Sequence, residues 1–266
     1  NLAWALQRMR ARLQPLAPAE RCAAAWHEAD AIADEDVAVN QAIGRHGLGL
    51  LQGLAPRDGR RLNLLTHCNA GWLATVDWGT ALAPVYAAQA AGLELHVWVD
   101  ETRPRNQGAA LTAWELQQQG IAHTLVADNA GGHLMQRGRV DAVIVGCDRV
   151  AANGDVCNKI GTYLKALAAR AHGVPFWVAM PRSTLDLGLA DGDAVPIEER
   201  AAREVTHLQG RCASGELVEV QLAPDGCAAA NPAFDVTPAA LVDALVTEYG
   251  VVEANAAALG RIAAAR

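Results

Sequence analysis

The sequence predicts an α/β fold: a Rossmann-like, mostly parallel sheet with helices on both faces, preceded by a helical connector. From residue 61 onward, short apolar runs alternate with segments of helical spacing. The runs are apolar throughout and partly β-branched, which is typical of strands covered on both faces. Strands that alternate regularly with helices indicate a doubly wound sheet.

Residues 1–60 are expected to form the helical connector and residues 61–266 the Rossmann-like domain. In the connector, apolar residues recur at helical spacing until Pro15 and Pro18 interrupt the pattern. A second helical segment, 18–51, is rich in alanine and ends in a glycine-rich stretch.

The elements of the second region follow in order. Strands are predicted at residues 62–66, 95–99, 124–127, 142–146 and 176–179. Crossover helices are predicted at residues 73–91, 109–120 and 160–173. Beyond residue 210, we expect a strand at 216–222 and a terminal helix from Pro238.

Composition places the chain among cytoplasmic proteins. A net charge of −7 argues against a general nucleic-acid binder, and no apolar run approaches the length of a membrane span. No secretory signal is visible. The six cysteines lack metal-type or CxxC spacing and are expected to be reduced thiols.

Polar residues follow each of the five predicted strands. These clusters are His67-Cys68-Asn69, Asp100 to Arg103, Asp128-Asn129, Asp148-Arg149 and Pro181-Arg182-Ser183. Ligands of open parallel sheets bind at the carboxyl ends of the strands. A single cluster is readily explained as a turn, but five in succession indicate an active site along one edge of the sheet.

Cys68 and Asp148 are the candidates for chemistry. A helix opening at 69–71 would lower the pKa of Cys68 and apolar surroundings would raise it, so a reactive thiol and an inert one both stay open. Asp148 closes the apolar run 142–147, where partial loss of water would let its carboxyl hold a proton and act as acid or base. An ion pair with Arg149 explains Asp148 equally well.

Asn158 and Lys159 are expected in a polar loop just before a helix. A lysine beside free N–H groups at a helix start is suited to phosphate, although most lysines are simply solvated. Gln107 precedes another helix in the same way, with Gly108 permitting close approach of the backbone. The chain has no GxGxxG after a strand, no P-loop, no GxSxG and no HExxH, so it predicts no nucleotide cofactor and no metal.

Several long strings resemble methylthioribose-1-phosphate isomerases. They are THCNAG (66–71), DETRPRNQGA (100–109), GCDR (146–149), AANGD (151–155), NKIGT (158–162), PRST (181–184) and NPAFDVTP (231–238). The resemblance runs from the first residues to about residue 250.

The resemblance implies that 5-methylthioribose 1-phosphate is converted to 5-methylthioribulose 1-phosphate in methionine salvage. It implies Cys68 and Asp148 as the catalytic pair, with Asp148 the proton donor, and it matches Gln107, Asn158 and Lys159 to substrate-binding positions. It also implies a cofactor-free homodimer. Hydrogen moves from C2 to C1 of the sugar either as a proton or as a hydride, and the sequence leaves both routes open.

Two features depart from the family pattern. Cys147 replaces an alanine, and no Arg-Gly-Ala phosphate loop precedes Asn1. We therefore expect an N-terminal domain to be missing. The alternatives are an isomerase of another phosphopentose, such as ribose 1,5-bisphosphate or 5-deoxyribose 1-phosphate, and a non-enzymatic regulatory subunit of the exchange factor for translation initiation factor two. Such subunits are expected to lack the paired Cys and Asp.

Overall fold

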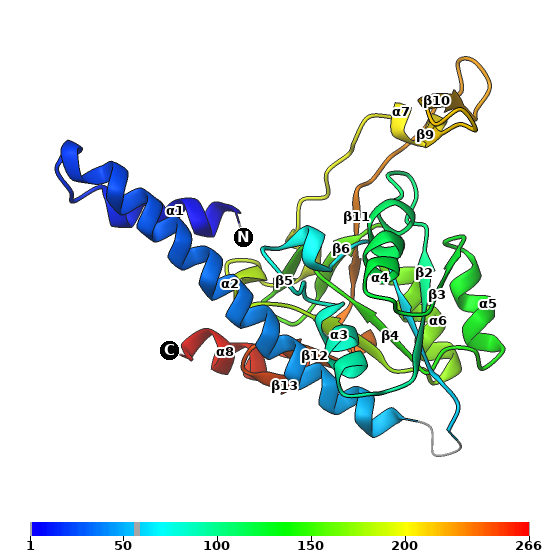
Figure 1. Cartoon of the computed structure of the whole chain (residues 1–266), viewed down its shortest axis with the longest axis horizontal. Coiled ribbons are helices and arrows are strands. Elements are labelled where there is room, and N and C mark those ends of the chain that lie inside the picture. The colour runs from blue at the N-terminus through cyan, green and yellow to red at the C-terminus, as the bar shows by residue number, and fades with distance from the viewer. Residues whose placement is uncertain (1, 56–58, 266) are drawn as a thin grey trace.

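The computed structural model describes residues 2–55 and 59–265 (Figure 1). Asn1 and residues 56–58 of the predicted connector lie outside the described residues. Helix α1 (Leu2–Leu13) ends before Pro15, and α2 (Pro18–Leu54) begins at Pro18, as the proline positions predict. α2 then continues without a break through the glycine-rich stretch.

The glycines in the last part of α2 allow close packing rather than ending the helix. A Cβ on Gly47 would lie 2.3 Å from Pro84 Cγ, and one on Gly44 would lie 3.1 Å from the Ala83 carbonyl oxygen. Both neighbours belong to α3 (Ala83–Ala90). The absence of side chains therefore lets the two helices approach each other.

Within the described residues, the main sheet has seven strands in the order β13-β12-β7-β4-β1-β2-β3. They are β1 (Leu62–Thr66), β2 (Leu95–Asp100), β3 (His123–Val126), β4 (Ala142–Val145), β7 (Phe176–Ala179), β12 (Ala244–Thr247) and β13 (Gly250–Val252). All neighbouring strands are parallel except β12 and β13. The five predicted strands are confirmed, each to within one residue at either end.

Helices cover both faces of this sheet, as predicted. In β4, Ala142 and Ile144 join the core cluster that contains residues of α2, α3 and α4 (Ala113–Gln118). Val143 and Val145 join the opposite cluster, with residues of three further helices. Those helices are α5 (Ala130–Gln136), α6 (Thr162–His172) and α8 (Ala256–Ala264). Alternate residues of one apolar run are thus buried on opposite sides of the sheet.

A smaller sheet lies beyond the carboxyl end of β4. It contains β11 (Phe234–Thr237), β6 (Val156–Lys159), β5 (Arg149–Ala151) and β8 (Leu185–Asp186), in that order. β6 is antiparallel to both of its neighbours. This sheet holds the chain that follows Asp148 against the chain that leads into α6.

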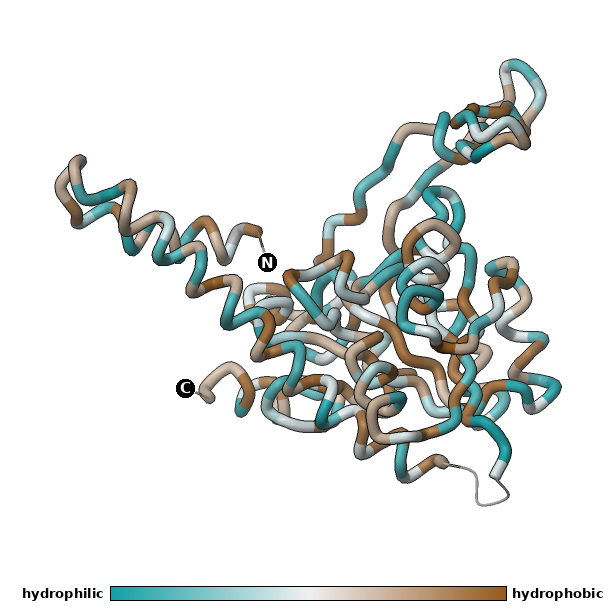
Figure 2. The backbone as a smooth tube through the Cα atoms, viewed as in Figure 1, coloured by the Kyte–Doolittle hydropathy of each residue, from teal (hydrophilic) through white to brown (hydrophobic). Residues whose placement is uncertain are grey.

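Two projections leave the body of the molecule (Figure 1). One consists of α1 and the first half of α2. The other is the hairpin of β9 (His207–Arg211) and β10 (Leu217–Gln221), which follows the short helix α7 (Arg203–Thr206). Figure 2 shows apolar residues on both projections. The helices of the described residues include none that combines the length and the apolar character of a membrane span.

Some predicted elements are wrong. The helix expected from Pro238 is a short 3-10 turn (Ala239–Leu241) followed by β12, and the last helix is α8. All four residues of β12 are buried between β7 and β13, so packing in the sheet prevails over the helical pattern. Helix α5 was not predicted, and the expected helix 73–91 is helical only at its start (Trp72–Ala74) and in α3.

We expect Gly47→Ala to lower the free energy of unfolding by about 1–3 kcal/mol, because its Cβ would overlap Pro84 at the contact between α2 and α3. Gly49→Ala is the matched control in the same helix, since nothing lies within 4 Å of the added Cβ. It should stabilise the protein by about 0.5–1 kcal/mol through helix propensity. Urea unfolding measures both, and equal shifts of the same sign would contradict this packing.

Candidate active site

Cys68 and Asp148 follow the two central strands of the sheet. The chain proceeds outward from β1 through β2 to β3 on one side and from β4 through β7 to β12 on the other. The strand order therefore reverses between β1 and β4, which is the topological switch point where open sheets bind ligands. The Cys68 and Asp148 loops flank this point.

Two hydroxyl groups hold the backbone of Cys68. Its N–H donates to Thr102 Oγ1 at 2.8 Å, and its carbonyl oxygen accepts from Thr112 Oγ1 at 2.6 Å. Cys68 has a positive φ of 66°, a conformation that a non-glycine residue adopts only when its surroundings enforce it. These contacts fix the direction in which the thiol leaves the chain.

The α-helix expected to open after Cys68 is absent from the described residues, which form only the 3-10 turn Trp72–Ala74 there. The N–H groups of Trp72 and Leu73 donate to the buried carboxylate of Glu115, at 2.9 and 3.0 Å. No helix start therefore acts on the thiol. Burial raises the pKa of Cys68 to about 11; the Asn69 N–H, Lys159 and Arg200 oppose this, whereas Asp148 adds to it. The thiol is neutral at pH 7.

Asp148 lies between β4 and β5, and its backbone N–H donates to the Cys157 carbonyl at 2.9 Å. Its side chain is exposed to solvent, yet surrounding protein removes enough of its hydration to raise the pKa of the carboxyl. Lys159 and Arg200 act in the opposite direction. Asp148 thus holds its proton to a higher pH than a free aspartate does.

Lys159 ends strand β6 and is buried. Its ammonium group donates to the Ala233 carbonyl at 3.1 Å and lies 4.3 Å from the centre of the Phe234 ring. Burial lowers the pKa of Lys159, and Arg200 lowers it further, while Cys68 and Asp148 raise it. Cys68, Asp148 and Lys159 act electrostatically on one another and therefore form one group.

The expected phosphate cradle of free N–H groups after Lys159 is wrong. Asn158 and Lys159 lie in a strand rather than in a loop, and α6 begins only at Thr162. The Asp235 carboxylate already accepts the N–H groups of Gly161, at 2.7 Å, and Tyr163, at 3.2 Å. The Asp235 carboxylate would repel an anion at that helix end. The Lys159 side chain is therefore the group here that stays available to an anionic ligand.

Asn158 and Gln107 lie next to residues of the site already described. The buried Asn158 donates from Nδ2 to Thr162 Oγ1 at 3.0 Å. Gln107 stands at the start of the helical segment that ends at Thr112, one of the two residues that hold Cys68. Its Oε1 is buried and has no hydrogen-bond partner among the described residues.

A glycine is required after Gln107. A Cβ on Gly108 would lie 1.7 Å from the Asp100 carbonyl oxygen. The chain continues as one turn of π-helix (Gly108–Thr112) before α4, a feature that often marks functional sites. Close approach of the loop to β2 therefore sets the place of Gln107, as the sequence predicted for Gly108.

A buried group of charges lies beneath the Cys68 loop. It consists of His67, Asp100, Asp128 and Lys165, and it is here called the buried charge group. The Asp100 Oδ2 atom is 3.1 Å from His67 Nδ1 and 2.9 Å from Lys165 Nζ. Lys165 also donates to the Asp128 carbonyl at 2.7 Å, and the Asp128 carboxylate accepts the Thr102 N–H at 2.7 Å.

Both ring nitrogens of His67 face acceptors. Nε2 lies 2.8 Å from the Ile160 carbonyl oxygen, and Nδ1 faces Asp100. The His67 ring therefore links Asp100 at the end of β2 to the segment that leads into α6. His67, Asp100 and Asp128 are spaced closely enough to ligate a metal ion, but the Lys165 ammonium already lies on the Asp100 oxygen. The group is therefore better suited to holding loops than to holding a metal.

The sequence and the fold of this chain both match known proteins. A model of the Initiation factor 2 subunit family matches residues 1–254. Methylthioribose-1-phosphate isomerase of Cereibacter sphaeroides is 62% identical over 260 residues, which cover 97% of this chain and 71% of that protein. The crystal structure of 5-methylthioribose 1-phosphate isomerase from Pyrococcus horikoshii OT3 matches with a TM-score of 0.86 and 42% identity, over 99% of this chain and 70% of that one.

The chain belongs to the methylthioribose-1-phosphate isomerase family. The resemblance inferred from the sequence motifs is confirmed. The family shares its fold with translation initiation factor eIF-2B subunit delta from A. fulgidus, whose structure matches with a TM-score of 0.78 and 42% identity over 93% of this chain and 68% of that one.

Two residues of this isomerase-family site, Arg200 and Lys165, lie in no motif of the sequence. Arg200 acts on Cys68, Asp148 and Lys159, although no motif pointed to it. Lys165 was read only as part of a helix. Lys165 follows Gly161 by four residues, so both lie on one face of a helix. Because Gly161 lies close to His67, this spacing is the signal that could have placed Lys165 against the buried charge group.

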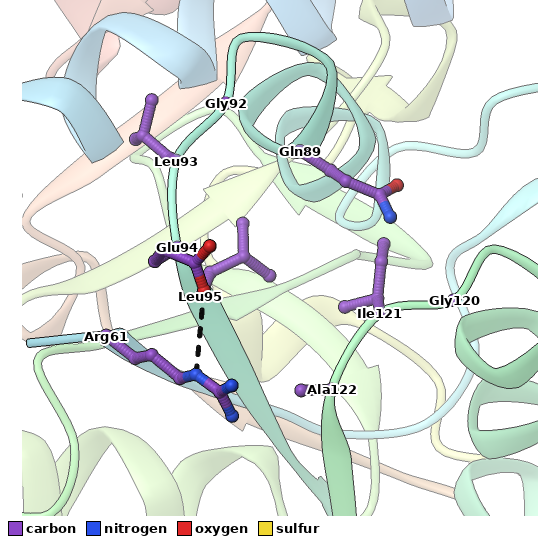
Figure 3. Close-up of a pocket in the computed structure, with 9 residues that line it drawn as sticks. All are labelled: Arg61, Gln89, Gly92, Leu93, Glu94, Leu95, Gly120, Ile121 and Ala122. Atoms are coloured by element: carbon purple, nitrogen blue, oxygen red, sulfur yellow. Dashed lines mark ion pairs between the residues drawn. The ribbon is translucent and has the colours of Figure 1, made fainter.

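Figure 3 shows a hollow at the opposite edge of the sheet. It is lined by residues that precede β1, β2 and β3, including Arg61 and Glu94, whose side chains form an ion pair at 3.7 Å. Because this hollow is at the amino ends of the strands, it is separate from the family's site.

We expect Cys68 to be alkylated by iodoacetamide slowly at pH 7 and about tenfold faster for each pH unit of increase below 11, because only the thiolate reacts. Cys212 is the internal control: hydrogen bonding to Ser214 lowers its pKa, so it should react first. Peptide mapping by mass spectrometry measures both sites. Rapid labelling of Cys68 at neutral pH would contradict the neutral thiol.

Lys165→Met should lower the free energy of unfolding by about 3–5 kcal/mol, because it leaves the buried Asp100 carboxylate without its ammonium partner. Arg61→Met breaks the exposed pair with Glu94 and should cost about 0–1 kcal/mol. Chemical denaturation at pH 7 compares them. Similar losses in the two variants would show that Lys165 contributes no more than a surface charge.

Proposed function

We propose that this chain converts 5-methylthioribose 1-phosphate into 5-methylthioribulose 1-phosphate, a reaction of methionine salvage. The observation that carries the proposal is the identity of 62% to a methylthioribose-1-phosphate isomerase over nearly the whole chain. The meeting of Cys68, Asp148 and Lys159 at the switch point of the sheet supports it.

The substrate makes acid catalysis necessary. Its C1 carries a phosphate ester, so the furanose ring has no free hemiacetal and does not open spontaneously. Protonation of the ring oxygen breaks its bond to C1 and leaves a positive charge there. The C2 hydrogen then moves to C1, and the C2 hydroxyl returns a proton to the carboxylate as the C2 carbonyl forms. We assign the proton to Asp148, because its raised pKa keeps the acid form at higher pH.

Cys68 is assigned a role as a neutral thiol beside the reacting carbons. With a pKa of about 11 it can donate a weak hydrogen bond or pass a proton, but little thiolate exists at neutral pH. Both a proton route and a hydride route are compatible with this assignment. Surroundings that disfavour charged forms, as the raised pKa values of Cys68 and Asp148 indicate, favour the hydride route.

Gln107, Asn158 and Lys159 are proposed to bind the substrate. The buried, unpartnered Oε1 of Gln107 is available to a sugar hydroxyl, and the Lys159 ammonium is available to an anionic group. Asn158 bonds Thr162 and adds a further amide to the same end of β6.

We also propose a division at residue 60, a cytoplasmic location and a homodimer. The six free cysteines support the location. Exposed apolar side chains on the two projections, such as Trp26 and Leu217, support association with another surface. The region from residue 61 onward holds every residue to which we assign a catalytic or binding role.

Proton NMR of the chain with 5-methylthioribose 1-phosphate tests the proposal by following formation of the ketose. Faster turnover of ribose 1,5-bisphosphate or 5-deoxyribose 1-phosphate would instead show that the substrate is another phosphopentose. Binding without turnover of any of the three would favour a regulatory role. In deuterated water, deuterium at C1 of the product indicates a proton route.

Asp148→Asn should lower kcat by about 10²–10⁴-fold, because the amide has no proton to give to the ring oxygen. In the parent chain, kcat should fall as pH rises through the raised pKa of Asp148, since the acid form is then lost. Asp225→Asn, on the exposed hairpin side of the molecule, is the control and should leave the rate unchanged. Full activity in Asp148→Asn would refute the assignment.

A further inference from the structure

Arg200 lies three residues before α7, in the segment that leads toward the β9–β10 hairpin. Its backbone N–H donates to the Asn231 carbonyl at 2.9 Å, and Glu199 forms a β-bridge with Pro232. This pairing places Arg200 beside the strand that begins at Phe234. Its side chain is only 19% exposed, which is unusual for an arginine in a connecting segment.

Arg200 and Lys159 share one aromatic ring. The Lys159 ammonium lies 4.3 Å and the Arg200 guanidinium 5.4 Å from the centre of the Phe234 ring. Phe234 is also the register partner of Lys159 in the pairing of β11 with β6. The ring thus attracts both cations and offsets part of the repulsion between them.

Few carboxylates compensate these two cations. In the part of the chain that the structure describes, the guanidinium bonds one Glu198 oxygen, from Nε and Nη2, each at 3.0 Å. That carboxylate is more than half exposed, so water screens it. Among the described residues, Lys159 bonds the Ala233 carbonyl, and the other carboxyl on which both cations act is Asp148. Two cations beside Cys68 and Asp148 thus have one exposed carboxylate, that of Glu198, as their hydrogen-bonded acidic partner in this part of the structure.

We propose that Arg200 is a substrate-binding residue that, together with Lys159, binds the phosphate group of the sugar phosphate. The proposal rests on the proposed function for the identity of the sugar. The planar guanidinium offers two parallel N–H groups to a phosphate, and the lysine adds a compact positive charge. The phosphate would then replace Glu198 as the main partner of Arg200.

The test compares Arg200→Gln, Arg200→Lys and Glu198→Gln with the parent chain. Arg200→Gln should raise KM for the sugar phosphate and the inhibition constant of inorganic phosphate by about 10- to 100-fold, with a much smaller change in kcat. Arg200→Lys should recover part of both losses. Glu198→Gln should lower both constants, because it removes a competitor for the guanidinium. A purely structural ion pair predicts no such opposite signs.

Arg203→Gln is the matched control, because Arg203 lies three residues further on and pairs at 2.8 Å with Glu219 of the exposed hairpin. Its KM and phosphate inhibition should stay those of the parent chain. Urea unfolding checks that each variant is folded, and Arg200→Lys carries the comparison if Arg200→Gln is not.

Inorganic phosphate also separates this proposal from the proposed function. If the parent chain does not isomerise 5-methylthioribose 1-phosphate, the function is wrong, and phosphate binding measured by calorimetry still reports on Arg200. An unchanged phosphate affinity in Arg200→Gln, or the absence of phosphate binding by the parent chain, would overturn the proposal. A loss in Arg200→Gln but not in Arg203→Gln supports it.

Discussion

The site depends on the burial of the Asp100 carboxylate at the end of β2. A carboxylate away from water is costly unless cations or hydrogen-bond donors surround it, and the Asp100 Oδ2 atom has Lys165 Nζ at 2.9 Å and His67 Nδ1 at 3.1 Å. These partners come from α6 and from the end of β1. One buried charge therefore fixes the relative positions of a strand, a helix and the loop that carries the thiol.

A series of hydrogen bonds links the buried charge group to the backbone of Cys68. Asp128 is held by Lys165 and in turn holds the Thr102 N–H, and the Thr102 hydroxyl accepts the N–H of Cys68. Thr102 and Cys68 both have a φ of 66°, so both residues occupy a left-handed conformation that these hydrogen bonds maintain. Three hydrogen bonds thus attach the backbone of Cys68 to rigid elements, which limits the movement of its thiol.

The sequence predicted the central strands well because a short run that is apolar throughout indicates a strand covered on both faces. It failed at β12, where residues 244–247 fit a helix equally well until β7 and β13 surround them. Cys68 and Asp148 could be singled out because each follows such a strand. The charge state of the thiol could not be predicted, since it depends mainly on how far the folded chain buries Cys68. Arg200 was missed because its proximity to Lys159 arises from pairing between distant segments.

The continuous helix α2 gives the molecule a mechanical property as well as a packing surface. Its buried residues begin at Asn40, so the part from Pro18 to that point stands clear of the core for about 30 Å at the α-helical rise. A rigid arm of that length magnifies rotation at its base: a tilt of about 10° moves its tip by roughly 5 Å. A protein domain bound to α1 would therefore be displaced by small changes in the packing of α2 against α3. Binding of α1 would in turn oppose such changes.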